Sequence, residues 1–181
     1  RDADTAMYRV KQHGRNGFHI FDASADGEGD DHLQLAADLQ HAVDRNQFAL
    51  AYQPLLSLTD QRLLGFEALL RWNHPSRGTL LPGEFLPVAE RMGLMGQIGA
   101  WVLDAACARL AAWSADPPAQ SGGAPLSMAV NVSGSQLRSG SFIDQVRTAL
   151  DAHGIAPASL RLEISERELV HDDPRVEAAL A

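Results

Sequence analysis

Glu67-Ala68-Leu69-Leu70-Arg71-Trp72 is the stretch of sequence that decides the fold, and it ends an apolar run that begins at Leu63. In a strand, successive side chains alternate between two faces. One face of this run is entirely apolar and consists of Leu64, Phe66, Ala68, Leu70 and Trp72. The opposite face carries Gly65, Glu67, Leu69 and Arg71. A strand in a protein core holds charge only where something compensates it, so the charged face predicts a functional site.

A structural alternative for Glu67 and Arg71 is an ion pair within the strand. Four residues of strand separate their Cα atoms by roughly 13 Å, which disfavours that pairing. We therefore prefer the hypothesis that both side chains face a ligand.

A second strand is predicted over residues 48–58, with Gln53 on the same face as Ala49 and Ala51. Only the four residues Thr59-Asp60-Gln61-Arg62 connect it to the strand that holds Glu67. Parallel neighbours need a crossover of about a dozen residues or more, so these two strands are predicted to pair antiparallel.

The remainder of the chain alternates helices with strands. From Glu84 onward the patterns predict helices to about Met92, over 97–113 and over 142–153, and strands over 126–133 and 160–165. This order predicts an α/β fold with a mostly parallel sheet.

Polar residues recur in phase on the predicted strands. Asn131 shares a face with Ala129 and Ser133, and Glu163 shares one with Arg161 and Ser165. If the sheet curls so that these faces converge, it builds a site at the strand ends. The seven histidines show no metal-ligand spacing, and His74 is interpreted as a turn residue.

Composition narrows the class of protein. The 181 residues carry a formal net charge of -8, which argues against binding a DNA or RNA polymer. A lone Cys107 indicates a reducing compartment, so we expect a cytoplasmic location. No apolar run approaches the roughly 20 residues of a membrane-spanning helix. An acidic chain binds an anionic substrate when bound cations invert the local field.

The N-terminal residues suggest a separate origin from the rest of the chain. Residues 1–22 show the pattern of one helix and one strand, which cannot form a core alone. Residues 23–32, rich in Asp, Gly and Ala, are predicted to be a linker. The main domain is predicted to start at residue 33.

Residues 33–181 resemble the EAL family of cyclic di-GMP phosphodiesterases. The matching motifs include Tyr52-Gln53-Pro54, the stretch from Glu67 to Trp72, Pro82-Gly83-Glu84-Phe85, Asn131-Val132-Ser133 and Leu162-Glu163-Ile164-Ser165-Glu166. Residues 4–21, with Asp4-Thr5-Ala6-Met7-Tyr8 and Gly14-Arg15-Asn16, resemble the C-terminal end of a GGDEF, or diguanylate cyclase, domain.

The resemblance implies a fold and a set of site residues. The fold would be a TIM-like (β/α) barrel with an antiparallel first strand, of which this chain is roughly the N-terminal half. Glu67, Asn131 and Glu163 would bind one or two Mg²⁺ or Mn²⁺ ions, for which oxygen ligands are suited. Gln53 and Arg71 would contact cyclic di-GMP, with Arg71 on a phosphate. Glu166 would steady a loop and support catalysis, and the product would be linear pGpG.

Several expectations concern the extent of the protein. Four predicted strands are half of the roughly eight in a complete barrel, so we expect further catalytic residues beyond Ala181. The 181 residues alone are expected to be inactive and poorly folded, and the parent protein could be a homodimer. The alternative function is a regulatory module that binds cyclic di-GMP without cleaving it.

Overall fold

The computed structural model of the chain describes residues 33–165. The chain divides into two compact units, residues 1–38 and 39–181, and most of the described residues belong to the second. Residues 33–39 are helical. The elements that follow are β1 (Phe48–Leu56), β2 (Leu63–His74), β3 (Gly78–Leu80), α3 (Pro82–Arg91), α4 (Met95–Ala115), η1 (Ala119–Ser121), β4 (Ser127–Val132), α5 (Gly134–Leu137), α6 (Phe142–His153), η2 (Pro157–Ser159) and β5 (Leu160–Ile164).

The strands form one sheet in the order β1-β2-β4-β5, with β3 paired to β2. β1 and β2 are antiparallel, which confirms the prediction drawn from their short connection. β2, β4 and β5 are parallel neighbours, joined by crossovers that contain α3, α4, α5 and α6. The predicted α/β class with a mostly parallel sheet is therefore confirmed.

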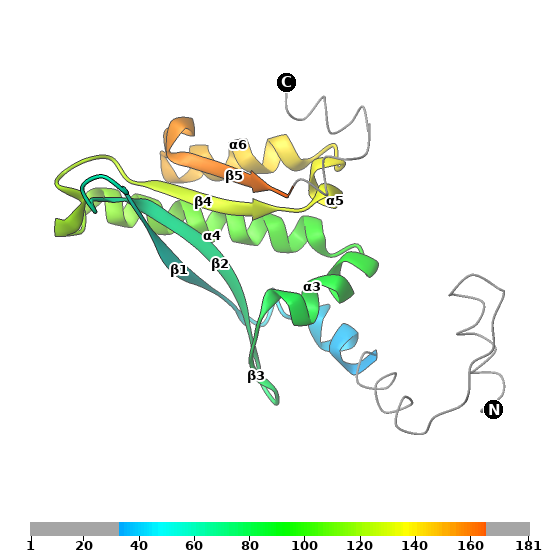
Figure 1. Cartoon of the computed structure of the whole chain (residues 1–181). Coiled ribbons are helices and arrows are strands. Elements are labelled where there is room, and N and C mark those ends of the chain that lie inside the picture. Colours follow the sequence, from blue (N-terminus) through cyan, green and yellow to red (C-terminus); the bar gives the residue numbers. More distant parts are fainter. Residues whose placement is uncertain (1–32, 166–181) are drawn as a thin grey trace, which may run out of the picture. The chain divides into compact units, whose positions relative to one another are not determined.

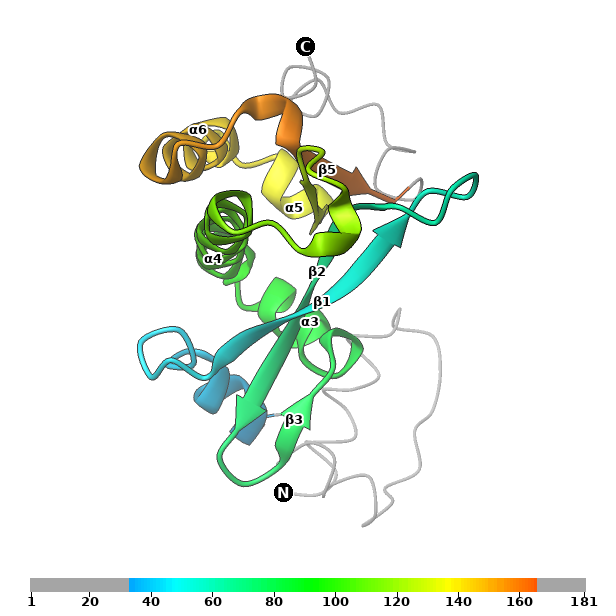
Figure 2. The same cartoon turned by 90° about the vertical axis from the view of Figure 1, so that its left-hand side faces the viewer.

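Helices α4 and α6 lie side by side along one face of the sheet, as the two perpendicular views in Figures 1 and 2 show. The alternation in β2 matches this arrangement, since Ala68, Leu70 and Trp72 are buried whereas Glu67 and Arg71 are only half-buried. The apolar face of β2 thus packs towards the helices, and its charged face points the other way.

Aromatic side chains fill the core where β1 and β2 meet the helices. The rings of Phe48 and Trp72 lie 6.2 Å apart, and Phe85 of α3 and Trp101 of α4 complete the cluster. The indole Nε1 of Trp72 donates a hydrogen bond to Oε1 of Gln47 at 3.0 Å. This satisfies the polar atom of a fully buried ring.

Local sequence signals explain where the helices begin and end. Pro82 occupies the first turn of α3, where its missing N–H costs nothing, and Glu84 accepts a hydrogen bond from the N–H of Leu81 at 2.6 Å. Gly154 ends α6 with φ of 64°, a left-handed conformation that glycine adopts without strain.

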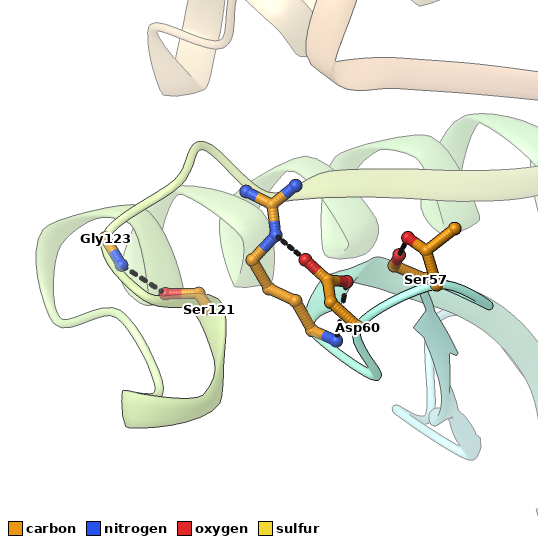
Figure 3. A network of polar contacts seen from close by, with 6 residues as sticks. Ser57, Asp60, Ser121 and Gly123 are labelled. Atoms are coloured by element: carbon orange, nitrogen blue, oxygen red, sulfur yellow. Dashed lines mark hydrogen bonds and ion pairs between the residues drawn. The ribbon is translucent and has the colours of Figure 1, made fainter.

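The connections at the N-terminal ends of β2 and β4 approach each other closely. In Figure 3, Asp60 forms an ion pair with the side chain of Arg62 and accepts a hydrogen bond from its backbone N–H. Nearby, Oγ of Ser121 accepts a hydrogen bond from the N–H of Gly123. A hydrogen bond from Ser57 is the main cause that lowers the pKa of the Asp60 carboxyl, and the backbone N–H of Arg62 adds to it. These contacts belong to the scaffold.

Three local features differ from the sequence-based expectations. The short elements β3 and α5 were not predicted. His74 is the last residue of β2 and is 4% exposed, and its ring packs 4.8 Å from that of Trp72 instead of forming a turn. Ser121 lies within residues 114–125, whose Pro, Gly and Ser content predicts a flexible surface loop, yet it is fully buried. Of the described helices, none is both long and apolar enough to traverse a lipid bilayer.

Candidate functional site

Four of the predicted site residues lie in register across the sheet. Gln53 of β1 is paired with Glu67 of β2, and Asn131 of β4 is paired with Glu163 of β5. Glu67 is paired with Ala129, two positions before Asn131, so Glu67 and Asn131 share a face. The register therefore places two carboxylates and two carboxamides on one face, opposite the face that packs against α4.

A hydrogen bond joins the two central members of this row. Nδ2 of Asn131 donates to Oε1 of Glu67 at 2.7 Å. The distance is typical of a hydrogen bond to an ionised acceptor. The carboxylate of Glu67, which is part of β2, is therefore also held by a residue of the neighbouring strand β4. Asn131 and Glu163 are exposed and Glu67 is half-buried, so this row is open to a ligand.

Arg71 lies four residues beyond Glu67 on the same face of β2. Its Nη1 donates to the carbonyl oxygen of Leu70 at 2.8 Å, so the guanidinium and the carboxylate of Glu67 have separate partners. This arrangement agrees with the sequence argument against an ion pair within the strand. The sixth candidate, Glu166, lies outside the described residues.

The donors in this row are of the kind that hard cations prefer. Carboxylates from Glu67 and Glu163 and an amide from Asn131 offer oxygen ligands only, which suits Mg²⁺ or Mn²⁺. Within residues 33–165, no group of three or more His, Cys, Asp or Glu side chains is arranged to bind a metal. The described residues thus fit part of a magnesium or manganese site in which an amide takes the place of a third carboxylate.

One residue near this row escaped the sequence analysis. Gln136 of α5 is 6% exposed, and its side chain bonds Ser133, the residue that follows β4. The signal was present as Ser133-Gly134-Ser135-Gln136, the spacing of a capping box, in which the residue types at the first and fourth positions bond each other. The four residues of α5 were too few to show helical periodicity.

Residues 36–181 match the family described as the EAL domain. The chain is 42% identical to the bifunctional diguanylate cyclase/cyclic di-GMP phosphodiesterase MucR of Pseudomonas aeruginosa, over 94% of the chain and 24% of that protein. It is 35% identical to the cyclic di-GMP phosphodiesterase NbdA of the same organism, over 95% of the chain and 21% of that protein.

The chain is also similar to a solved structure. The PaMucR phosphodiesterase in complex with c-di-GMP superimposes with a TM-score of 0.72 at 41% identity, over 81% of this chain and 56% of that one. This likeness confirms the predicted class, part of a TIM-like barrel with an antiparallel first strand. The chain spans only about a quarter of the length of the curated relatives it matches.

Proposed function

The chain belongs to the EAL domain family, and from this membership we propose that the protein containing it hydrolyses cyclic di-GMP to linear pGpG with the help of divalent cations. Two relatives, MucR and NbdA, bear the name of cyclic di-GMP phosphodiesterases, and the similar PaMucR structure is a c-di-GMP complex. The observation that carries the proposal is the hydrogen bond between Asn131 and Glu67, flanked in register by Gln53 and Glu163.

In this proposal, the two carboxylates and the amide hold the metal. Glu67, Asn131 and Glu163 contribute one oxygen donor from each of three adjacent parallel strands. Mg²⁺ or Mn²⁺ bound there supplies a Lewis acid that lowers the pKa of a coordinated water and neutralises charge on the phosphoryl oxygens. Because the chain has a net charge of -8, an anionic dinucleotide would be attracted to this face only with cations held between the carboxylates, where they would reverse the local field.

Two further residues are proposed to orient the substrate. Gln53 is exposed on β1 directly opposite Glu67, where its carboxamide can donate to or accept from the dinucleotide. Arg71 presents a guanidinium on the same face, and its planar donors match the geometry of a phosphate oxygen pair. Glu166 is proposed to support this site from the segment that follows β5.

We propose that the chain contains parts of two domains. Residues 1–22 are the end of a GGDEF domain, 23–32 a linker and 33–181 the N-terminal part of an EAL domain. The bifunctional name of the MucR relative, which aligns over 94% of the chain, supports the tandem arrangement. Limited proteolysis of the full-length protein with cleavage confined to 23–32 would support these domain boundaries.

We also propose a cytoplasmic location, since the lone Cys107 fits a reducing compartment, and a homodimeric parent protein.

The decisive experiment incubates the full-length protein with cyclic di-GMP and Mg²⁺ and separates the products by chromatography. We expect pGpG to accumulate, EDTA to stop its formation and excess Mg²⁺ to restore it. Glu67→Gln removes a metal-binding charge and should lower kcat by at least about 100-fold. Asp151→Asn is the matched control, because Asp151 is exposed on α6, away from the row.

The competing function makes a distinct prediction in the same assay. A regulatory EAL module would bind cyclic di-GMP, measured by calorimetry, yet release no pGpG with Mg²⁺ or Mn²⁺. That result from the intact protein would refute the proposed hydrolysis. The presence of both Glu67 and Glu163 favours the catalytic alternative, because binding alone does not require two metal-ligating carboxylates.

A further inference from the structure

The turn that follows β4 is held by a buried glutamine from α5. Oε1 of Gln136 accepts a hydrogen bond from the backbone N–H of Ser133 at 3.1 Å and another from its Oγ at 3.0 Å. In return, the N–H of Gln136 donates to Oγ of Ser133 at 3.4 Å. The end of β4 is therefore fixed two residues after Asn131.

The same glutamine is pressed against the backbone of α4. A Cβ atom placed on Gly99 would overlap Nε2 of Gln136 and lie 2.9 Å from its Cδ. The carboxamide can occupy this position only because residue 99 has no side chain. Gln136 thus connects the turn after β4 to the longest helix of the described chain.

Ordinary packing between β4 and α4 is incomplete at this point. A cavity of about 290 Å³ lies between them, lined by Val130 and Val132 of β4 and by Ile98 and Val102 of α4, and Asn131 and Gln136 also line it. Interior side chains normally interdigitate with few voids larger than a water molecule. With a cavity beneath the strand, the polar contact through Gln136 gains importance as a support for the end of β4.

We infer that Gln136 is a positioning residue for Asn131, and hence for the metal site of the proposed function, on which this inference rests. Acting through Ser133, it fixes the position and direction of the end of β4, so that the amide of Asn131 hydrogen-bonds the carboxylate of Glu67 at 2.7 Å. Residues that hold metal ligands in position without touching the metal typically contribute 10- to 100-fold to metal affinity or activity.

The first test replaces Gln136 by leucine in the full-length protein. Gln136→Leu keeps the approximate volume but removes the acceptor for Ser133, so Mn²⁺ affinity, measured by calorimetry without substrate, should fall about 10-fold or more. The Mg²⁺ concentration for half-maximal activity should rise by a similar factor. Gln145→Leu on α6 is the control, since Gln145 lines a separate cavity beside α4, and it should bind Mn²⁺ like the wild type.

A second pair of variants separates positioning from packing. Gly99→Ala displaces the carboxamide of Gln136 and should lower both the melting temperature and Mn²⁺ affinity. The double variant Gly99→Ala/Gln136→Ala relieves the overlap, so the melting temperature should recover relative to Gly99→Ala. Mn²⁺ affinity should stay low, because the bond to Ser133 is still missing. Recovery of affinity in the double variant would show a packing role only and overturn the inference.

The outcomes distinguish this inference from the proposed function. Wild-type protein that binds Mn²⁺ but releases no pGpG refutes the hydrolysis, while the affinity comparison still tests Gln136. Wild-type protein that releases pGpG, with Gln136→Leu binding Mn²⁺ as tightly as the wild type, overturns the inference and leaves the hydrolysis intact. Wild-type protein that binds no Mn²⁺ and releases no pGpG overturns both.

Discussion

The side-chain amide of Asn131 lies 2.7 Å from the carboxylate of Glu67, so one hydrogen bond spans the neighbouring parallel strands β4 and β2. The two residues are 64 positions apart in the sequence. The register of the strands brings them together, and this contact is also the most direct probe of the site.

Asn131→Asp should convert that attraction into a repulsion between two carboxylates. Without metal, we expect the free energy of unfolding of the full-length protein to fall by about 1 kcal/mol, the usual contribution of one hydrogen bond. Mg²⁺ should stabilise the variant more than the wild type, because the cation neutralises both charges. Thermal unfolding in EDTA and in Mg²⁺ measures both effects. Asn131→Leu lacks the added charge and should gain less from Mg²⁺ than Asn131→Asp. Equal melting temperatures of wild type and Asn131→Asp in EDTA would contradict the prediction.

Arg71→Lys should weaken substrate binding while preserving positive charge. A lysine ammonium cannot reproduce the forked donor geometry of the guanidinium. A lost hydrogen bond to a charged group costs about 1.5–3 kcal/mol, so KM should rise about 10- to 100-fold with a smaller change in kcat. Steady-state kinetics of the full-length protein check this. Arg147→Lys, on the exposed side of α6, is the control, and an unchanged KM for Arg71→Lys would rule out its contact with the phosphate.

Gly65→Ala should destabilise the pairing of β2 with β4. A methyl group at Gly65 would overlap the carbonyl oxygen of Ser127, which belongs to the backbone and cannot rotate away. We expect a loss of about 1–3 kcal/mol in the free energy of unfolding, the usual cost of overpacking. Gly96→Ala is the matched control, because a methyl group there meets no atom within 4 Å and lies in α4. Equal stability of the two variants in denaturant titrations would contradict the close contact.

Cys107 should make stability fall at alkaline pH. Burial, together with the nearby charge of Asp104, raises the pKa of its thiol from 9.0 to about 11. Between these values the unfolded chain loses the proton and the folded chain keeps it, so the free energy of unfolding decreases as pH rises. The full effect is about 2–3 kcal/mol, present below pH 9 and lost by pH 11. Cys107→Ala should show a shallower decline over this range, and parallel curves for the two proteins would contradict the assignment.

Much of the sheet could be predicted because its signals are local. The four residues from Thr59 to Arg62 were enough to require an antiparallel pair, and the alternation around Glu67 separated the buried face from the charged one. The same alternation placed Asn131 and Glu163 on the face opposite the apolar positions of their strands.

Other features depend on contacts between distant segments. The pairing of Glu67 with Ala129, which brings Asn131 into reach, is set by how two strands align across a long crossover. His74 is the last residue of β2, and its ring packs against Trp72 two positions earlier, so its burial follows from how far the strand extends, which its turn-like local sequence did not indicate. β3 has three residues, fewer than any periodic pattern needs. Gln136 gains its importance from Gly99, 37 positions earlier, and no local pattern links the two.

The long crossover between β2 and β4 affects the order in which the parts of the protein fold. The β1–β2 hairpin is a local structure and can form early, whereas β4 must close a large loop before it docks beside β2. Asn131 meets Glu67 only after that docking, so we expect the capacity to bind metal to arise late in folding. Any event that detaches β4 would then dismantle the proposed metal site while leaving the hairpin intact.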